Sequence, residues 1–179
     1  MLEKVISAGQ TGANEAGLAT AKRFGLQTGG WMPMDWETAD GPRPDFEKLY
    51  GMRMHSQGTR ERMATNVRIS DGTIRFATSF QSSNEKLALF WAREHRKPHF
   101  DVDLAAPPDP QLVIDWIKAN EIKSLHVTGS TESKAARKKT KGVFTQVSEF
   151  LEAVFIGLGH KVVEVPEVAA PAAEPAPTV

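Results

Sequence analysis

The stretch VISAGQTGANEAGLATAKRFG, residues 5–25, decides the fold of this chain. Its short apolar beginning predicts a buried strand over residues 4–7. Alanine and leucine at helical spacing predict a helix over residues 14–24, with a glycine to end it. The turn between strand and helix, called the glycine loop below, consists of Gly9, Gln10, Thr11 and Gly12.

The same alternation of strand and helix continues along the chain. Further strands are expected at residues 73–77, 98–104 and 124–128, and further helices at residues 60–69 and 85–96, from Asp109 onward, and over residues 143–154. This alternation predicts an α/β fold, an open parallel sheet of about five strands with helices on both faces. The strand order is expected to reverse beside the first strand, where such sheets bind ligands. Residues 29–58 show no clear period and are predicted to be a long functional loop.

The chain has 179 residues, of which 40% are hydrophobic, and this suits a single globular domain. Residues 165–179 are rich in proline and alanine and have too little large apolar surface to order themselves. They are predicted to be a disordered tail, which leaves residues 1–164 as the ligand-binding domain.

Composition excludes several classes of function. Lysine and arginine together number 22, as do aspartate and glutamate, so the net charge is zero and gives no support to nucleic-acid or membrane binding. The absence of cysteine excludes disulfides, thiolate metal sites and a cysteine nucleophile. The five histidines show no spacing typical of a metal site. No signal peptide and no apolar run of about 20 residues is recognisable, so a cytoplasmic protein is expected.

The glycine loop has the chemistry of an anion site. Its two glycines allow the backbone to approach a ligand with positive φ, and the following helix directs free N–H groups and its positive dipole end to the same place. No lysine and serine or threonine follow in the Walker pattern. The alternative is a strand-to-helix turn that needs glycine only for its geometry.

Two more polar loops follow predicted strands. The serine loop, residues 78–84, supplies hydroxyls and an amide just before a helix, and Ser83 or Asn84 is alternatively a simple N-cap. The terminal loop, residues 129–133, offers a place for a second anion. Asp101 and Asp103 share one side of a strand, which suits a ribose hydroxyl or a cation.

Basic and aromatic residues add candidates whose alternatives stay open. Residues 134–141 form either a solvated helix face or a source of phosphate ligands. The cations considered as phosphate ligands are Lys134 and Arg137, one turn apart, and Arg60, Arg62 and Arg68. The side chains that either cover a planar ring or fill a small core or a subunit interface are Trp31, Met32, Met34 and Trp36.

The predicted site therefore combines the loops that follow the strands. No catalytic residue and no metal ligand is assigned. The residues predicted to bind the ligand are Gly9, Gln10, Thr11, Gly12, Asn14, Ser79, Ser82, Ser83, Asn84, Asp103, Gly129, Ser130, Thr131, Glu132 and Ser133. Of these, the glycine loop is expected to take the anionic end, and Asp103 to anchor a hydroxyl or a ring nitrogen.

The segment ISAGQTGANEAGL, residues 6–18, resembles the GGQTGxDRAAL opening of the molybdenum cofactor carrier proteins. These are a branch of a Rossmann-like superfamily that includes the LOG and DprA proteins. The resemblance covers about residues 4–157 and continues through GGWMP (29–33), ADGPRP (39–44), RMATNVRISDGT (62–73), KPHFDVDL (97–104) and VTGSTES (127–133). It implies a compact, Rossmann-like, homo-oligomeric carrier that binds a pterin-based cofactor through polar and basic loops.

Departures from the family pattern fall on the ligand-facing loops. Ala8 replaces a glycine, and the family's Asp-Arg pair is replaced by Asn14 and Glu15. The glycine-rich turn of the family is Ser82-Ser83-Asn84 here, and its Pro-Arg is Ser130-Thr131. The fold is therefore expected to transfer better than the ligand.

The expected function is non-catalytic binding of an anionic, phosphorylated small molecule, either a molybdopterin-type cofactor or a nucleotide derivative. An alternative is a LOG-like nucleotide phosphoribohydrolase, whose PGGxGTxxE turn is reduced here to a glutamate, Glu85, at a shifted position. A single-strand DNA binder of the DprA kind is a further alternative, and the neutral net charge counts against it.

Overall fold

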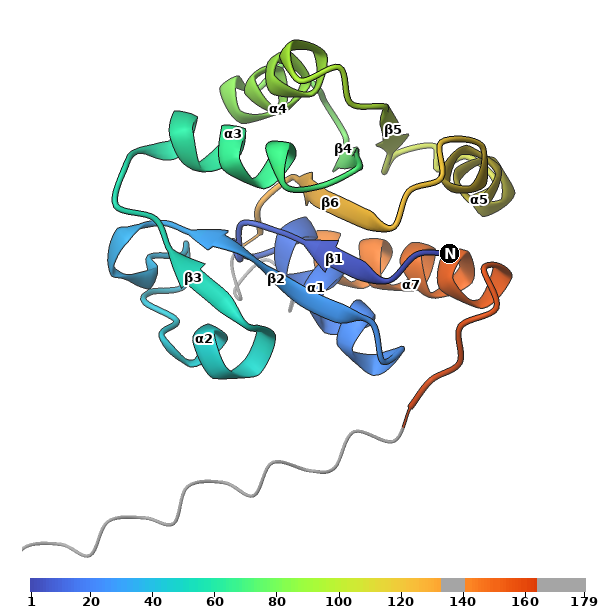
Figure 1. Ribbon diagram of the computed structural model, residues 1–179, viewed down its shortest axis with the longest axis horizontal. Coiled ribbons are helices and arrows are strands. Elements are labelled where there is room, and N and C mark those ends of the chain that lie inside the picture. The colour runs from blue at the N-terminus through green and yellow to red at the C-terminus, as the bar shows by residue number, and fades with distance from the viewer. Residues whose placement is uncertain (133–140, 164–179) are drawn as a thin grey trace, which may run out of the picture.

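The computed structural model describes residues 1–132 and 141–163 (Figure 1). The predicted tail, Ser133, Lys134 and Arg137 lie outside these described residues. Within them, no helix is long and apolar enough to cross a membrane.

The centre of the fold is one six-stranded, all-parallel sheet with the order β3-β2-β1-β6-β4-β5. Its strands are β1 (Lys4–Ile6), β2 (Gln27–Met32), β3 (Met52–Met54), β4 (Gly72–Ala77), β5 (His99–Asp103) and β6 (Ser124–Gly129). The chain runs from β1 to β2 and β3 on one side and then places β4 and β5 on the other side, with β6 between β1 and β4. The predicted α/β fold and the reversal beside β1 are confirmed.

Helices cover both faces of the sheet. They are α1 (Ala13–Arg23), α2 (Asp45–Tyr50), α3 (Thr59–Arg68), α4 (Ser83–Glu94), α5 (Pro110–Ala119) and α7 (Val143–Gly157), with a short 3₁₀ turn, η1 (Met34–Trp36). Helices α3 and α4 pack together on one face, and α1 and α5 both contact α7 on the other. In Figure 1, α3 and α4 lie above the sheet and α1 and α7 below it.

Residues 29–58 are not the long loop that was predicted. They contain most of β2, the turn η1, helix α2 and the short strand β3. A period-2 pattern is absent because β2 carries two glycines, Gly29 and Gly30, and at Gly30 the neighbouring backbone approaches closely. A Cβ at Gly30, whose φ is 132°, would lie 2.0 Å from the carbonyl oxygen of Ser7 in the neighbouring strand loop.

The aromatic residues of this region form a small core of their own, called the satellite core below. Trp36 and Leu49 pack against it. Its buried members are Leu18, Met32, Phe46, Tyr50 and Met52. The satellite core thus accounts for Trp36, Phe46 and Tyr50 of residues 29–58, whereas Met34 and Met54 are exposed.

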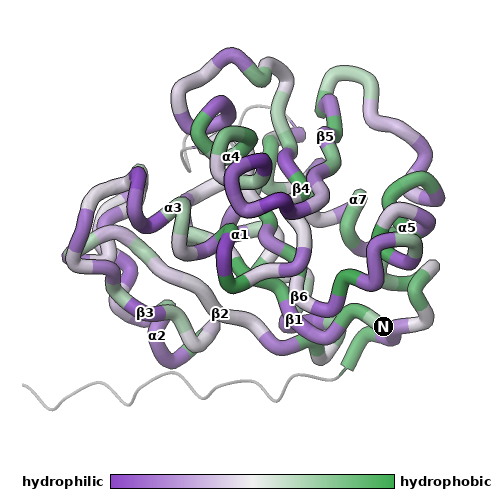
Figure 2. Tube along the Cα trace, turned by 45° about the horizontal axis from the view of Figure 1, so that its top comes forward, coloured by the Kyte–Doolittle hydropathy of each residue, from purple (hydrophilic) through white to green (hydrophobic). Residues whose placement is uncertain are grey.

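The two faces of the sheet differ in chemistry. Apolar residues of α1, α5 and α7 form one continuous core with the sheet. The hydrophobic stretches of the chain trace are green in Figure 2. Side chains that point to α3 and α4 are polar although they are buried. They include Thr73, Arg75, His126 and Thr128. Parallel sheets are ordinarily apolar on both faces, so the polar face has to be explained by contacts of its own.

Candidate functional site

A cleft of about 390 Å³ lies at the carboxyl ends of the parallel strands, where the predicted loops meet. Its lining residues follow β1, β2, β4 and β6 or belong to the first turn of α3. They are Gln10, Pro33, Glu37, Thr38, Ala39, Thr59, Arg62, Asn84 and Thr131. The cleft therefore brings together Gln10, Asn84 and Thr131 from three of the loops predicted to form the site.

A second compartment of about 280 Å³ continues this cleft towards the end of β3. The two hollows share Pro33, Glu37, Thr59 and Arg62. The second is completed by Met34, Asp35, Ser56, Gln57 and Gly58. Together they offer the volume of a small ligand pocket.

The glycine loop has the predicted positive φ values, 67° at Gly9 and 82° at Gly12. The reason at Gly12 is contact with the terminal loop. A Cβ there would lie 2.5 Å from the carbonyl oxygen of Ser130 and 2.9 Å from the main-chain nitrogen of Glu132. The N–H of Ala13 donates to the same Ser130 oxygen at 3.1 Å. The glycine is therefore needed to join two loops, and not only to admit a ligand.

The amino end of α1 is buried, and Gln10 alone of the glycine loop lines the cleft. Gly12 is the N-cap, and no side chain of the described residues caps this helix. The carbonyl of Gln10 accepts from the N–H of Glu15 at 2.9 Å, which closes the first turn. Thr11 is only 2% exposed, and its hydroxyl has no hydrogen-bond partner among the described residues. The positive end of the α1 dipole is thus left without a side-chain partner beside Gln10.

The amino end of α7 is already occupied. Glu132 is buried, and its carboxylate accepts from the N–H groups of Val143 and Phe144, each at 3.0 Å. The helix dipole and two main-chain donors hold this carboxylate, and Glu132 is not among the residues that line the cleft, so its contact with a ligand stays a prediction. In the terminal loop, Thr131 is the residue that lines the cleft.

Asn14 also serves the protein itself. Its side-chain oxygen accepts from the main-chain N–H of Ala8 at 3.3 Å and from the Ser7 hydroxyl at 3.1 Å. The side chain is buried behind the glycine loop. Its carboxamide fixes the backbone at the start of the glycine loop, and Asn14 is not among the residues that line the cleft, so its contact with a ligand stays a prediction.

The serine loop contributes less than was predicted. Ser82, and not Ser83 or Asn84, is the N-cap of α4, and its hydroxyl accepts from the N–H of Glu85 at 3.2 Å. Ser83 and Asn84 lie in the first helical turn, and Asn84 alone of this loop lines the cleft. Ser79 is exposed and is not among the residues that line it.

The two aspartates of β5 are engaged elsewhere. Asp103 lies on an edge strand, separated from β1 by β4 and β6, and it accepts from the N–H of Ala105 at 2.8 Å. Asp101 accepts from Arg75 at 2.7 Å and 2.5 Å in a two-point ion pair. The predicted anchoring role of Asp103 is not supported, because its strand is remote from the cleft.

Arg62 is the cation that the structure places in the cleft. It lines both compartments, is only 6% exposed, and has a terminal nitrogen, Nη1, without a hydrogen-bond partner among the described residues. Burial lowers the pKa of its guanidinium. Arg60 lies instead over the Phe90 and Trp91 rings, at 5.1 and 5.0 Å. A buried guanidinium without a carboxylate beside it is costly unless a ligand supplies the negative charge.

Two other buried ionisable groups lie on the polar face. Burial, and secondly repulsion from Arg62, lowers the pKa of His126 to about 3, so its ring is neutral. Burial raises the pKa of the Glu85 carboxyl to about 7, although the Arg75 charge opposes this shift. The Arg75 guanidinium donates to the Glu85 carbonyl at 2.6 Å. The sequence analysis did not predict that Arg75, Glu85 and His126 would be buried on this face. The signal in the sequence is Arg75, an arginine inside an apolar strand.

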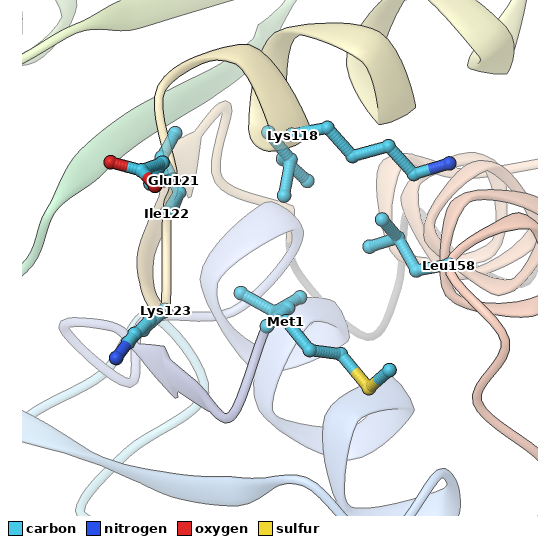
Figure 3. Close-up of a pocket in the computed structure, with 8 residues that line it drawn as sticks. Met1, Lys118, Glu121, Ile122, Lys123 and Leu158 are labelled. Carbon is cyan, nitrogen blue, oxygen red and sulfur yellow. The ribbon is translucent and has the colours of Figure 1, made fainter.

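Another hollow, of about 330 Å³, lies at the opposite, amino-terminal edge of the sheet (Figure 3). Met1, Leu158 and the residues at the end of α5 surround it. None of the predicted site residues lines this pocket, so the candidate site is the cleft at the carboxyl edge. Among the described residues there is no cluster of histidine, aspartate and glutamate able to hold a metal ion.

Comparisons with known proteins agree with this architecture. The model of the circularly permutated YpsA SLOG family matches residues 5–155. A solved structure, that of a candidate molybdenum carrier protein from Syntrophus aciditrophicus SB, is 25% identical in sequence and superimposes with a TM-score of 0.73. The match covers 86% of this chain and 94% of that one. No curated protein matches the sequence. Since the family model spans most of its length, the chain belongs to the circularly permutated YpsA SLOG family.

Proposed function

We propose that this protein is a non-catalytic carrier, which binds an anionic, phosphorylated small molecule in the cleft at the carboxyl edge of the sheet. The observation that carries the proposal is Arg62, a buried cation that lines the cleft and has no carboxylate partner among the described residues. An anionic ligand would remove the cost of burying this charge.

Neighbouring groups support the same ligand charge. The amino end of α1, which has no side-chain cap among the described residues, adds the positive end of its helix dipole beside Gln10. Gln10, Asn84 and Thr131 line the cleft with amide and hydroxyl groups that hydrogen-bond phosphate oxygens. Each bond to a charged oxygen contributes about 1.5–3 kcal/mol, so a few of them account for micromolar binding.

Two cargoes fit these donors. The solved structural relative is described as a candidate molybdenum carrier, which favours a molybdopterin-type cofactor. A nucleotide derivative presents the same phosphate chemistry to Arg62 and the glycine loop. For a carried molecule the protein needs donors for its anionic end and a cleft of sufficient volume, and the cleft has both.

The position of Glu85 supports a carrier rather than a phosphoribohydrolase. Its carboxyl is buried and is not among the groups that line the cleft. A general acid or base has to come within hydrogen-bond reach of the substrate. We further propose that the carrier works in the cytoplasm as a homo-oligomer, in line with the family resemblance.

The proposal is tested on freshly purified protein by native mass spectrometry and calorimetry. The probes are molybdate, molybdopterin-type cofactor and a panel of nucleotides. Arg62→Met is compared with Arg68→Met, a matched change at an exposed arginine of the same helix. We expect at least tenfold weaker binding for Arg62→Met and unchanged binding for Arg68→Met. The proposal is wrong if no probe binds, or if the folded Arg62→Met variant keeps full affinity.

A further inference from the structure

Glu37 has an unusual position in the cleft. It follows β2, the strand next to β1, and lines both compartments. Its main-chain carbonyl accepts a hydrogen bond from the side chain of Gln10 at 2.8 Å. This contact fixes Glu37 beside the glycine loop, next to the place proposed for the phosphate.

The carboxylate of Glu37 is exposed and has no hydrogen-bond or ion-pair partner among the described residues. Arg62 lines the same two hollows, and these opposite charges do not pair with each other. A purely anionic ligand would satisfy Arg62 and be repelled by Glu37. A ligand with an anionic end and a group rich in O–H donors would satisfy both.

Other carboxylates near the cleft fit this role less well. Asp35 lines only the second compartment and not the one that Gln10 lines. Glu37 lines both, and its carbonyl accepts the hydrogen bond from Gln10. Asp103 is on the far edge strand. A divalent cation would need a cluster of ligands, and the described residues contain none.

We infer that Glu37 binds the two neighbouring hydroxyls of a ribose, and that the natural ligand is a ribonucleotide or a larger cofactor with a ribonucleotide part. In doubly wound α/β folds, an acidic residue after the second strand, about 20 residues beyond the glycine turn, accepts from the ribose hydroxyl. Glu37 lies five residues beyond the end of β2, directly after η1, and 25 residues beyond Gly12, which is near that place in the order of the chain. The inference rests on the proposed function, because it assumes a phosphate at the glycine loop.

The test compares ribose and deoxyribose forms of one nucleotide. Calorimetry is performed with ADP, 2′-deoxy-ADP and 2′,3′-dideoxy-ADP on the full chain, on Glu37→Gln and on the matched control Glu47→Gln, a change at an exposed glutamate of α2 that lines neither compartment. We expect the wild-type protein to bind ADP about tenfold more tightly than the 2′-deoxy form, which loses one hydrogen bond to the carboxylate, and about a hundredfold more tightly than the dideoxy form, which loses two. Glu37→Gln should abolish most of this preference, and Glu47→Gln should keep it.

The outcomes separate this inference from the carrier function. Equal binding of the three nucleotides to the wild-type protein overturns the role of the ribose and leaves anion binding intact. A preference for ribose that survives Glu37→Gln overturns the role of Glu37. If molybdate or molybdopterin-type cofactor binds and no nucleotide does, the ligand class inferred here is wrong while the carrier proposal stands.

Discussion

The carbonyl oxygen of Ser130 accepts the N–H of Ala13 at 3.1 Å, which joins the loop after β6 to the first turn of α1. These loops follow strands that are neighbours in the sheet and far apart in the sequence. The hydrogen bond requires Gly12 to have a positive φ and no side chain. One backbone contact thus holds together two walls of the cleft.

Substitution of Gly12 is therefore expected to damage stability and not only binding. Gly12→Ala strains the backbone and drives a Cβ into two main-chain groups, so we expect a loss of about 2–4 kcal/mol in the free energy of unfolding. Gly41→Ala is the control, because its φ is 98° and a Cβ there meets nothing within 4 Å. It should cost about 1–2 kcal/mol, from strain alone. Equal losses in urea titrations of both variants would contradict the loop contact.

Arg62→Met should have opposite effects on stability and binding. The substitution removes a buried charge that has no ion-pair partner among the described residues and keeps most of the apolar stem. We expect the ligand-free protein to gain about 1–3 kcal/mol in its free energy of unfolding, measured by chemical denaturation. Arg68→Met should change it by less than about 0.5 kcal/mol. A large loss of stability in Arg62→Met would show that the guanidinium has a structural partner.

Glu85 predicts a pH dependence with a defined sign. Its folded pKa, about 7, lies above the ordinary value of 4.5, so the folded protein holds the proton more tightly than the unfolded chain does. The contribution of Glu85 to the free energy of unfolding is therefore complete below pH 4.5 and is lost as the pH rises from 4.5 to about 7. It amounts to about 3 kcal/mol for a fully buried group. Glu85→Gln should equal the wild-type protein near pH 4 and exceed it in stability at pH 8.

The opposite contribution of His126 has to be separated from this effect. Its folded pKa, about 3, lies below the ordinary 6.5, so its contribution is lost as the pH falls through that window. Both variants in the comparison contain His126, and its effect cancels in the difference between their denaturation curves. A difference between wild type and Glu85→Gln that does not change between pH 4 and pH 8 would contradict the raised pKa of Glu85.

The capping role of Glu132 can be measured in the same way. Glu132→Gln removes the negative charge that faces the amino end of α7 and weakens two hydrogen bonds. We expect a loss of about 1 kcal/mol in the free energy of unfolding. Glu149→Gln breaks an exposed ion pair with Lys141 and should cost only a few tenths of that, about 0.3 kcal/mol. Calorimetric melting of both variants provides the measurement.

Much of the fold could be predicted because its elements have simple periodic patterns. The helix after the glycine loop and the strands β4, β5 and β6 combine apolar spacing with clear turn residues. The region from β2 to β3 could not be predicted, since Gly29 and Gly30 interrupt the strand pattern and its methionines and aromatics fill a separate core. The glycines of β2 are explained by tertiary contacts, such as the close approach of Ser7 to Gly30, and such contacts cannot be read from the sequence.

The location of the candidate site followed from topology, because the carboxyl ends of parallel strands meet at one edge. The side chains that line the site could not be predicted from the topology. Asn14 and Glu132 have polar groups suited to a ligand, but main-chain donors of the protein already hold them. Arg62 was one of several arginines in the sequence, and only its burial and missing partner distinguish it.

Because one wall of the cleft is anchored by the small satellite core, the two walls are expected to differ in stability against local unfolding. Glu37 lies in the segment whose buried apolar side chains belong to the satellite core, whereas Thr131 follows β6, a strand of the main core. Segments with few buried apolar contacts open more often, and their amide protons exchange sooner with solvent. A ligand that bridges both walls would therefore slow exchange in β2, η1 and β3 far more than in β6. If the protein works as the proposed carrier, ligand capture would order the segment from β2 to β3 against the rest of the sheet.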